Sequence, residues 1–212
     1  MNFKSLFFQL KKDLLSPVFV VVFLSFLVLT FSIAYLSLEK KASENFLGLT
    51  VLGSNMMAEN YYPGGNSTIV VGETVKWYIN AQNHLGSPEY LSLRLKLLNS
   101  SQFLPLDNFS RSTPSPVSHI FELNRMVPNN STWIIPMNWT VTNADENHTT
   151  IESLNVNDIQ INGVNTRSVT GKDFMIVLEL WRYDTRDKDF TFIWPSQTGE
   201  RVTWVQIWFS LK

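Results

Sequence analysis

Hydrophobic residues in this chain follow two patterns, one continuous and one alternating. From Pro17 to Leu38 the chain runs for 22 residues without Asp, Glu, Lys, Arg or His. At roughly 1.5 Å per residue, a helix of this length reaches about 33 Å, which exceeds the roughly 30 Å of a bilayer's hydrocarbon core. The pattern predicts a single transmembrane helix over residues 16–38, with Ser16 as its N-cap and Pro17 as its first helical residue.

After residue 45, apolar and polar side chains alternate with the period of two that is typical of half-buried strands. The clearest alternating segments are residues 46–52, 74–81, 90–98, 132–141, 174–183 and 201–211. Residues 142–171 are polar and rich in Asn, and predict one short strand at 159–161. About eight short strands without a convincing amphipathic helix predict a mainly β fold, an immunoglobulin-like antiparallel β-sandwich over residues 46–212. A jelly roll is the alternative fold.

The segments before and after the helix set its orientation. Residues 1–15 form a basic head, either an interfacial helix or an ordinary positive flank, and residues 39–45 form a juxtamembrane linker. Glycosylation sequons occur only after the helix, and they have meaning only on the translocated side of a membrane. They begin at Asn66, Asn99, Asn108, Asn129, Asn130, Asn138 and Asn147. We therefore expect a single-pass protein of the cell membrane with a cytoplasmic N-terminus, an extracellular C-terminal domain and lipid contacts through residues 17–38. A secretory signal cleaved after Ala34 is the alternative, although the apolar segment is longer than such signals usually are.

Composition excludes several kinds of chemistry. The chain has no cysteine, and therefore no disulfide, thiolate nucleophile or Cys-ligated metal. Its formal net charge is −1 without a long run of either sign, which argues against a nucleic-acid partner. Hydrolase, metalloprotease and nucleotide-binding motifs are absent, so we expect no catalytic residues, no cofactor and no metal. We interpret the acidic residues near His148 and after Asp184 as parts of solvated turns rather than as cation sites.

Aromatic residues give the sharpest hypothesis about a site. Alternation in residues 174–183 and 201–211 places one set of large side chains on the outer face of the sheet. This set consists of Trp181, Trp204, Gln206 and Trp208. An exposed face of this kind usually marks a partner or a ligand, so we expect a partner-binding face here. The alternative is that residues 101–118 or 142–171 fold over this face and form a second small core.

Several short segments resemble the archaeal DUF1616 domain family. These are Leu52-Gly53, residues 58–63 (AENYYP), Val71-Gly72-Glu73, Asn83-His84, residues 180–183 (LWRY) and residues 204–208 (WVQIW). The resemblance covers most of residues 45–211 and implies an uncharacterised, membrane-anchored extracytoplasmic domain. Two features depart from the family: this chain has one membrane helix rather than several, and Leu85 replaces an acidic residue.

The expected function is therefore a membrane-anchored extracytoplasmic binding or structural module of the cell envelope, without catalytic activity. Its expected partner is an envelope protein or glycan. Two alternatives stay open, an accessory subunit of a membrane protein complex and an envelope hydrolase that acts on glycans or peptides. The sequence does not identify the partner or the oligomeric state.

Overall fold

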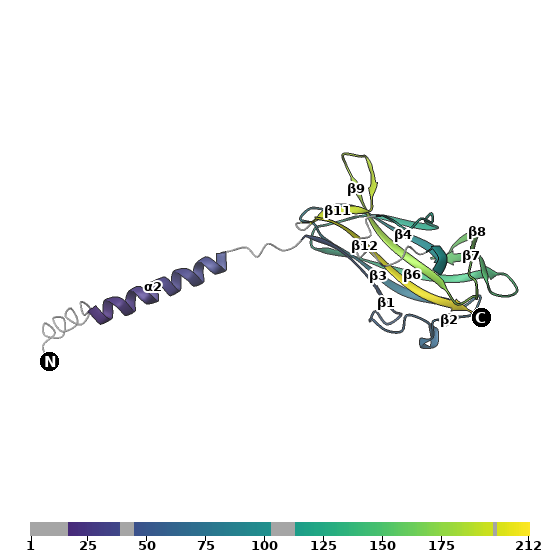
Figure 1. The fold of residues 1–212 in the computed structure, drawn as a ribbon, viewed down its shortest axis with the longest axis horizontal. Coiled ribbons are helices and arrows are strands. Elements are labelled where there is room, and N and C mark those ends of the chain that lie inside the picture. The colour runs from purple at the N-terminus through teal and green to yellow at the C-terminus, as the bar shows by residue number, and fades with distance from the viewer. Residues whose placement is uncertain (1–16, 39–44, 103–112, 197–198) are drawn as a thin grey trace. The chain divides into compact units, whose positions relative to one another are not determined.

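The computed structural model describes residues 17–38, 45–102, 113–196 and 199–212 (Figure 1). The chain divides into two compact units, residues 1–43 and 44–212, and each is considered by itself.

One apolar helix, α2 (Pro17–Leu38), forms the described part of the first unit. Residues 17–37 have a mean hydropathy of 2.6 and are exposed in the protein alone, so their length and composition suit a membrane anchor or a signal sequence. The four Ser and Thr hydroxyls of this helix each donate to the carbonyl four residues earlier, at 2.7 to 2.9 Å. Their hydrogen-bonding needs are thus met within the helix, as a hydrocarbon environment requires.

The described residues of the second unit form strands and two single-turn 3-10 helices, Pro63–Gly65 and Ser100–Gln102. The strands are β1 (Phe46–Leu52), β2 (Thr68–Ile69), β3 (Thr74–His84), β4 (Glu89–Asn99), β5 (Phe121–Val127), β6 (Ser131–Ala144), β7 (Thr150–Val156), β8 (Ile159–Arg167), β9 (Phe174–Asp184), β10 (Asp189–Thr191), β11 (Ile193–Ser196) and β12 (Gly199–Leu211). One sheet has the order β1-β3-β6-β7-β8, and the other has the order β11-β12-β9-β4-β5, with β10 on β9 and β2 on β12.

The strand order is that of an immunoglobulin domain rather than a jelly roll. Strands β1, β3 and β6 occupy the places of A, B and E, while β12, β9, β4 and β5 occupy those of G, F, C and C′. A β7–β8 hairpin extends the first sheet where strand D usually lies. Every pairing among the described strands is antiparallel except the short parallel contact between β2 and β12. The predicted immunoglobulin-like antiparallel β-sandwich is therefore confirmed.

Large apolar side chains from both sheets fill the space between them. The alternating residues of β3 and β6 point inward, so Trp77 and Trp139 meet edge to face with ring centroids 5.2 Å apart. Trp139 lies 5.1 Å from Phe209 of the opposite sheet, measured between ring centroids. Since each of these rings is almost completely buried, an aromatic cluster holds the sheets together in a domain that has no disulfide.

The prediction for residues 142–171 was wrong in extent. Instead of one short strand at 159–161, this segment contains β7 and the nine-residue β8. A register shift between Ile151 and Ser153 interrupts the alternation of β7, so that Ser153 and Leu154 are buried consecutively. The period of two is lost at this bulge, and β8 is mostly exposed, so neither strand carries the usual signature.

Candidate functional site

The tryptophans of the predicted face do lie on one outer surface. Strand β12 pairs with β9, with Trp204 opposite Glu179 and Trp208 opposite Met175. Strand β9 in turn pairs with β4, where Trp181 lies opposite Ser92. Because directly opposed residues point to the same side of a sheet, all three tryptophans leave the sheet on the side away from the main core.

A second small core covers the middle of this face. Leu98, Met175 and Val177 are fully buried there, and Val117 and Trp204 pack against them. Val117 belongs to the connection between β4 and β5. The middle of this face is therefore covered by a connection that has its own small core, which was the alternative to an open binding face. Gln206 is half-buried, and its Oε1 is buried without a hydrogen-bond partner in the described part of the chain.

A buried ion pair fixes the covering connection to the sheet. Lys96 on β4 and Glu179 on β9 are 4% and 1% exposed, and Lys96 Nζ lies 2.9 Å from Glu179 Oε2. Ser115 of the connection donates to Glu179 Oε1 through its backbone N–H at 2.7 Å and its hydroxyl at 3.0 Å. Lys96 Nζ donates to the Ser115 carbonyl at 2.8 Å, and Trp181 Nε1 donates to Glu179 Oε2 at 3.1 Å. Both charges are thus paired and hydrogen-bonded, which burial of charge requires.

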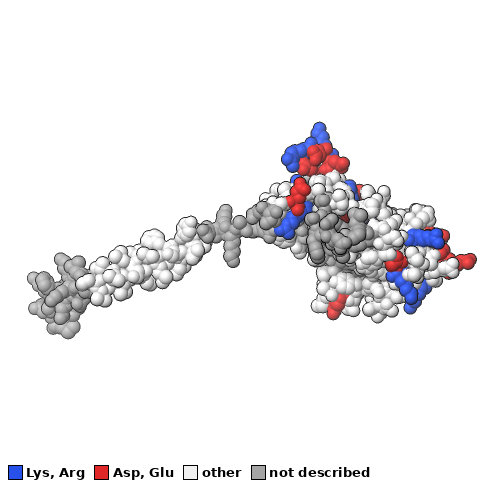
Figure 2. All heavy atoms as spheres, viewed as in Figure 1, with Lys and Arg blue, Asp and Glu red and all other residues white. Residues whose placement is uncertain are grey.

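Beyond this ion pair, Trp181 forms one wall of a surface pocket of about 340 Å³. Its other walls come from the β9–β10 hairpin and from Phe192, whose ring centroid is 5.4 Å from that of Trp181. The Arg94 guanidinium stacks 4.1 Å from the Trp181 ring centroid. Asp187 and Asp189 also line this pocket, which we call the hairpin pocket. Figure 2 shows charges of both signs gathered on this hairpin. Sequence reasoning treated these acids as a turn and missed the pocket.

The turn of that hairpin is held by its own charges. The backbone N–H of Arg186 donates to Asp184 Oδ1 at 2.9 Å, and the Arg186 guanidinium pairs with the same carboxylate at 3.3 Å. This backbone hydrogen bond, followed by the bond from the guanidinium, lowers the pKa of Asp184. Asp184 therefore holds the turn.

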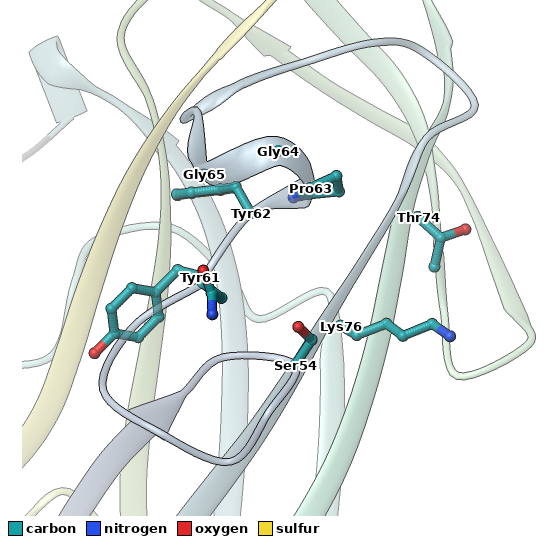
Figure 3. Close-up of a pocket in the computed structure, with 9 residues that line it drawn as sticks. Ser54, Tyr61, Tyr62, Pro63, Gly64, Gly65, Thr74 and Lys76 are labelled. Carbon is teal, nitrogen blue, oxygen red and sulfur yellow. The ribbon is translucent and has the colours of Figure 1, made fainter.

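A larger cavity, of about 410 Å³, lies beneath the loop that follows β1 (Figure 3). We call it the loop pocket. Its lining residues are Ser54, Asn60, Tyr61, Tyr62, Pro63, Gly64, Gly65, Thr74 and Lys76. Figure 3 shows Thr74 and Lys76 on β3 beside the loop, and the extended Lys76 side chain points away from Ser54. The sequence offered only a resemblance for residues 58–63 and no sign of a cavity, because the loop meets β3 only in the folded chain.

The loop is fixed to the sandwich through its two tyrosines. The indole N–H of Trp77 donates to the Tyr61 carbonyl at 2.6 Å, and the Tyr62 hydroxyl donates to the Trp208 carbonyl at 2.5 Å. Burial raises the pKa of Tyr62, so its hydroxyl stays protonated as a donor at any physiological pH. Trp208, predicted as part of a binding face, is 38% exposed and anchors this loop through its backbone.

The sequons differ in accessibility. Asn66, Asn130, Asn138 and Asn147 are exposed, while Asn99 and Asn129 are half-buried. The side-chain amide of Asn99 donates to the Arg167 carbonyl. Asn108 lies outside the described residues.

No group of three or more His, Asp or Glu side chains is placed to hold a metal ion within the described residues. Asp145 bonds to its own loop: its carboxylate accepts from the Thr149 hydroxyl at 2.7 Å, and from the N–H groups of Thr149 and Thr150 at 2.6 and 2.7 Å. The bond from the Thr149 hydroxyl, then that from Thr150, lowers the pKa of Asp145. The His84 ring stacks on Phe46, with centroids 4.5 Å apart.

Comparison with known proteins assigns no family to this chain. No protein-family model matches the chain, and no curated protein matches it. Among solved structures, it is similar to the CARDB domain of a Pyrococcus furiosus protein, crystallised in complex with di-metal ions. The identity is 8% and the TM-score 0.38, over 80% of this chain and 90% of that domain. No property of that domain is transferred to this chain at this level of similarity, and the resemblance to the DUF1616 family stays a prediction.

Proposed function

We propose that this protein is a membrane-anchored, extracytoplasmic module that binds or organises a partner in the cell envelope and has no catalytic activity of its own. The observation that carries the proposal is α2, a helix of 22 residues without a charged side chain, joined to a β-sandwich unit. A sandwich held by its own core needs no membrane to fold, so the helix has the properties of an anchor.

Three acidic side chains are engaged in holding local structure, which favours a binding role over a catalytic one. Glu179 holds the covering connection, Asp145 holds its loop, and Asp184 holds the hairpin turn. Catalytic carboxylates need to converge on one another or on a nucleophile. The hairpin pocket instead combines aromatic walls with two acidic rim residues, an arrangement that suits recognition of a basic or polar group on a partner.

Membrane topology is tested by single-cysteine labelling, because the natural chain contains no cysteine. Intact cells would express full-length Ser5→Cys or Ser54→Cys protein and be treated with a membrane-impermeant maleimide. We expect Ser54→Cys to react from outside and Ser5→Cys to react only after detergent is added. Labelling of Ser5→Cys alone in intact cells would reverse the proposed orientation, and recovery of the protein in the soluble fraction would rule out an anchor.

Partner binding is tested by gentle solubilisation of the tagged protein and quantification of what co-purifies. We expect Asp187→Lys, which reverses a charge on the hairpin pocket, to reduce the recovery of the partner. Glu146→Lys makes the same charge change at another exposed position and serves as the matched control. Equal recovery with both variants would exclude the hairpin pocket as the partner site. A stoichiometric membrane complex would instead identify an accessory subunit.

A further inference from the structure

The loop pocket is preformed, and this property makes it a candidate ligand site. At the end of β1, a Cβ on Gly53 would lie 1.9 Å from the Glu59 carbonyl oxygen, so only glycine permits this closure. The Gly53 N–H donates to the Met57 carbonyl at 2.8 Å, and the Asn55 side-chain amide donates to Glu59 at 2.8 Å. With Tyr61 and Tyr62 also bonded to the sandwich, the loop keeps its shape without a ligand. Preformed cavities of several hundred Å³ are typical of small-molecule sites.

The polar groups around the loop pocket are available to a ligand. Within the part of the chain that the structure describes, no hydrogen bond or ion pair is found for the Ser54 hydroxyl, the Asn60 side-chain amide or the Lys76 ammonium group. Lys76 is the only charged residue among those that line this pocket, and no Asp or Glu faces it there. Lys76 is exposed, and its flexible stem lets the ammonium group supply a single positive charge at the rim of this pocket, beside short groups that both donate and accept hydrogen bonds.

This combination fits one ligand chemistry. Hydroxyl and amide side chains match the hydroxyls of a sugar, which also donate and accept, while one ammonium group balances one negative charge. A phosphate dianion would leave half of its charge unmatched by a single lysine. We infer that the loop pocket binds an acidic saccharide, a sugar residue that carries a carboxylate, with Lys76 as the partner of that carboxylate.

A sequon next to the loop pocket suggests where such a saccharide can come from. Lys76 lies directly opposite Asn138 in the pairing of β3 with β6, and Thr74 lies opposite Thr140 of the same sequon. The hydroxyls of Thr74 and Thr140 are 2.9 Å apart, which places both residues on the outer face. Opposed side chains have Cβ atoms about 5 Å apart, so a glycan on the exposed Asn138 would begin beside Lys76. The saccharide is therefore either this glycan or one carried by another molecule.

The test uses full-length protein in detergent, with sodium glucuronate as the probe and glucose as its neutral counterpart, followed by saturation-transfer NMR. We expect glucuronate to bind and Lys76→Met to weaken its affinity at least roughly tenfold, because a hydrogen bond to a charged group is lost. Lys76→Arg should retain binding, since the positive charge is kept. Lys172→Met, the same change at an exposed lysine outside this pocket, is the matched control. Equal affinity for glucuronate and glucose, or unchanged binding by Lys76→Met, overturns the inference.

A second comparison separates the two sources of the saccharide. Asn138→Gln removes the sequon, and this variant is compared with the natural protein purified from native membranes. If only the variant binds glucuronate, the glycan on Asn138 fills the loop pocket in the natural protein. If both bind equally, the saccharide comes from another molecule. If neither binds, the inference is wrong. Binding of glucuronate by the purified protein does not depend on the orientation of α2, so labelling and binding results can be interpreted separately.

Discussion

Lys96 and Glu179 show how single residues determine which surface of this protein meets water. Both lie on the outer face of a sheet, where a charged side chain ordinarily reaches solvent, yet both are buried. They are stable there because Ser115 supplies a carbonyl to one and two donors to the other. A buried ion pair adds little stability compared with apolar packing, but removal of one member leaves the other as an unpaired buried charge.

Glu179→Gln should therefore destabilise the protein by about 3 kcal/mol, because the Lys96 ammonium group loses its counter-charge in a buried site. Urea unfolding of the full-length protein, followed by tryptophan fluorescence, measures this loss. Glu122→Gln is the matched control, since Glu122 pairs with Arg94 at 3.0 Å on the same face but is 27% exposed. It should cost less, about 1 kcal/mol, because this pair is only half-buried and keeps access to water. Equal losses would mean that burial does not distinguish the two pairs.

Asp145 should make stability depend on acidity. Its pKa is lowered in the folded state by the bond from the Thr149 hydroxyl and then by that from Thr150. Its contribution is therefore fully present above its ordinary value of 3.8 and is lost as the pH falls through the lower, folded value. We expect the fall in Tm on acidification below that value to be smaller in Asp145→Asn than in the natural protein. Parallel Tm curves for the two proteins would show that the loop does not depend on the carboxylate charge.

At the scale of elements, the connection between β4 and β5 determines which part of the predicted aromatic face is covered and which part is exposed. The outward residues of β9 and β12 were identified from alternation, and the sheet register agrees with this assignment. Alternation does not reveal which loop lies above a face. Val117 and Ser115 come from a segment rich in Pro and Ser that carries no periodic signal, and their docking depends on a charge pair formed by two other strands.

Substitution of Trp204 should destabilise the protein more than substitution of Trp208, although both residues lie on the outer face of β12. Trp204 packs on the buried cluster of Leu98, Met175 and Val177, so Trp204→Ala should cost about 2 kcal/mol or more of unfolding free energy. Trp208 is 38% exposed, and Trp208→Ala should cost about 1 kcal/mol or less. Urea denaturation of both variants provides the measurement. A large loss for Trp208→Ala would place its ring in the core, whereas a folded variant that fails to capture a partner would assign this ring to binding.

At the scale of the whole molecule, exposure predicts which sequons carry glycans if the sandwich lies outside the cell. Asn138 and Asn147 are exposed, so both should be modified in protein isolated from native membranes. Asn99 should stay unmodified, because its side-chain amide is half-buried and donates to the Arg167 carbonyl. Peptide mapping by mass spectrometry distinguishes these sites. Modification of Asn99 with Asn138 and Asn147 unmodified would contradict this ranking.

The sequence by itself determined the features that depend on local geometry. The backbone fixes the periods of helices and strands, so the sequence alone predicts two kinds of feature. These are an uncharged segment long enough to cross a bilayer and the inward faces of β3, β4, β6, β9 and β12. Tertiary structure decided which distant residues lie together: Ser115 on Glu179, Ser54 and Lys76 in the lining of one pocket, and the β7–β8 hairpin whose bulge interrupts the alternation. These contacts join residues distant in the chain, and they form because burial of the whole core selects one register and one path for each loop.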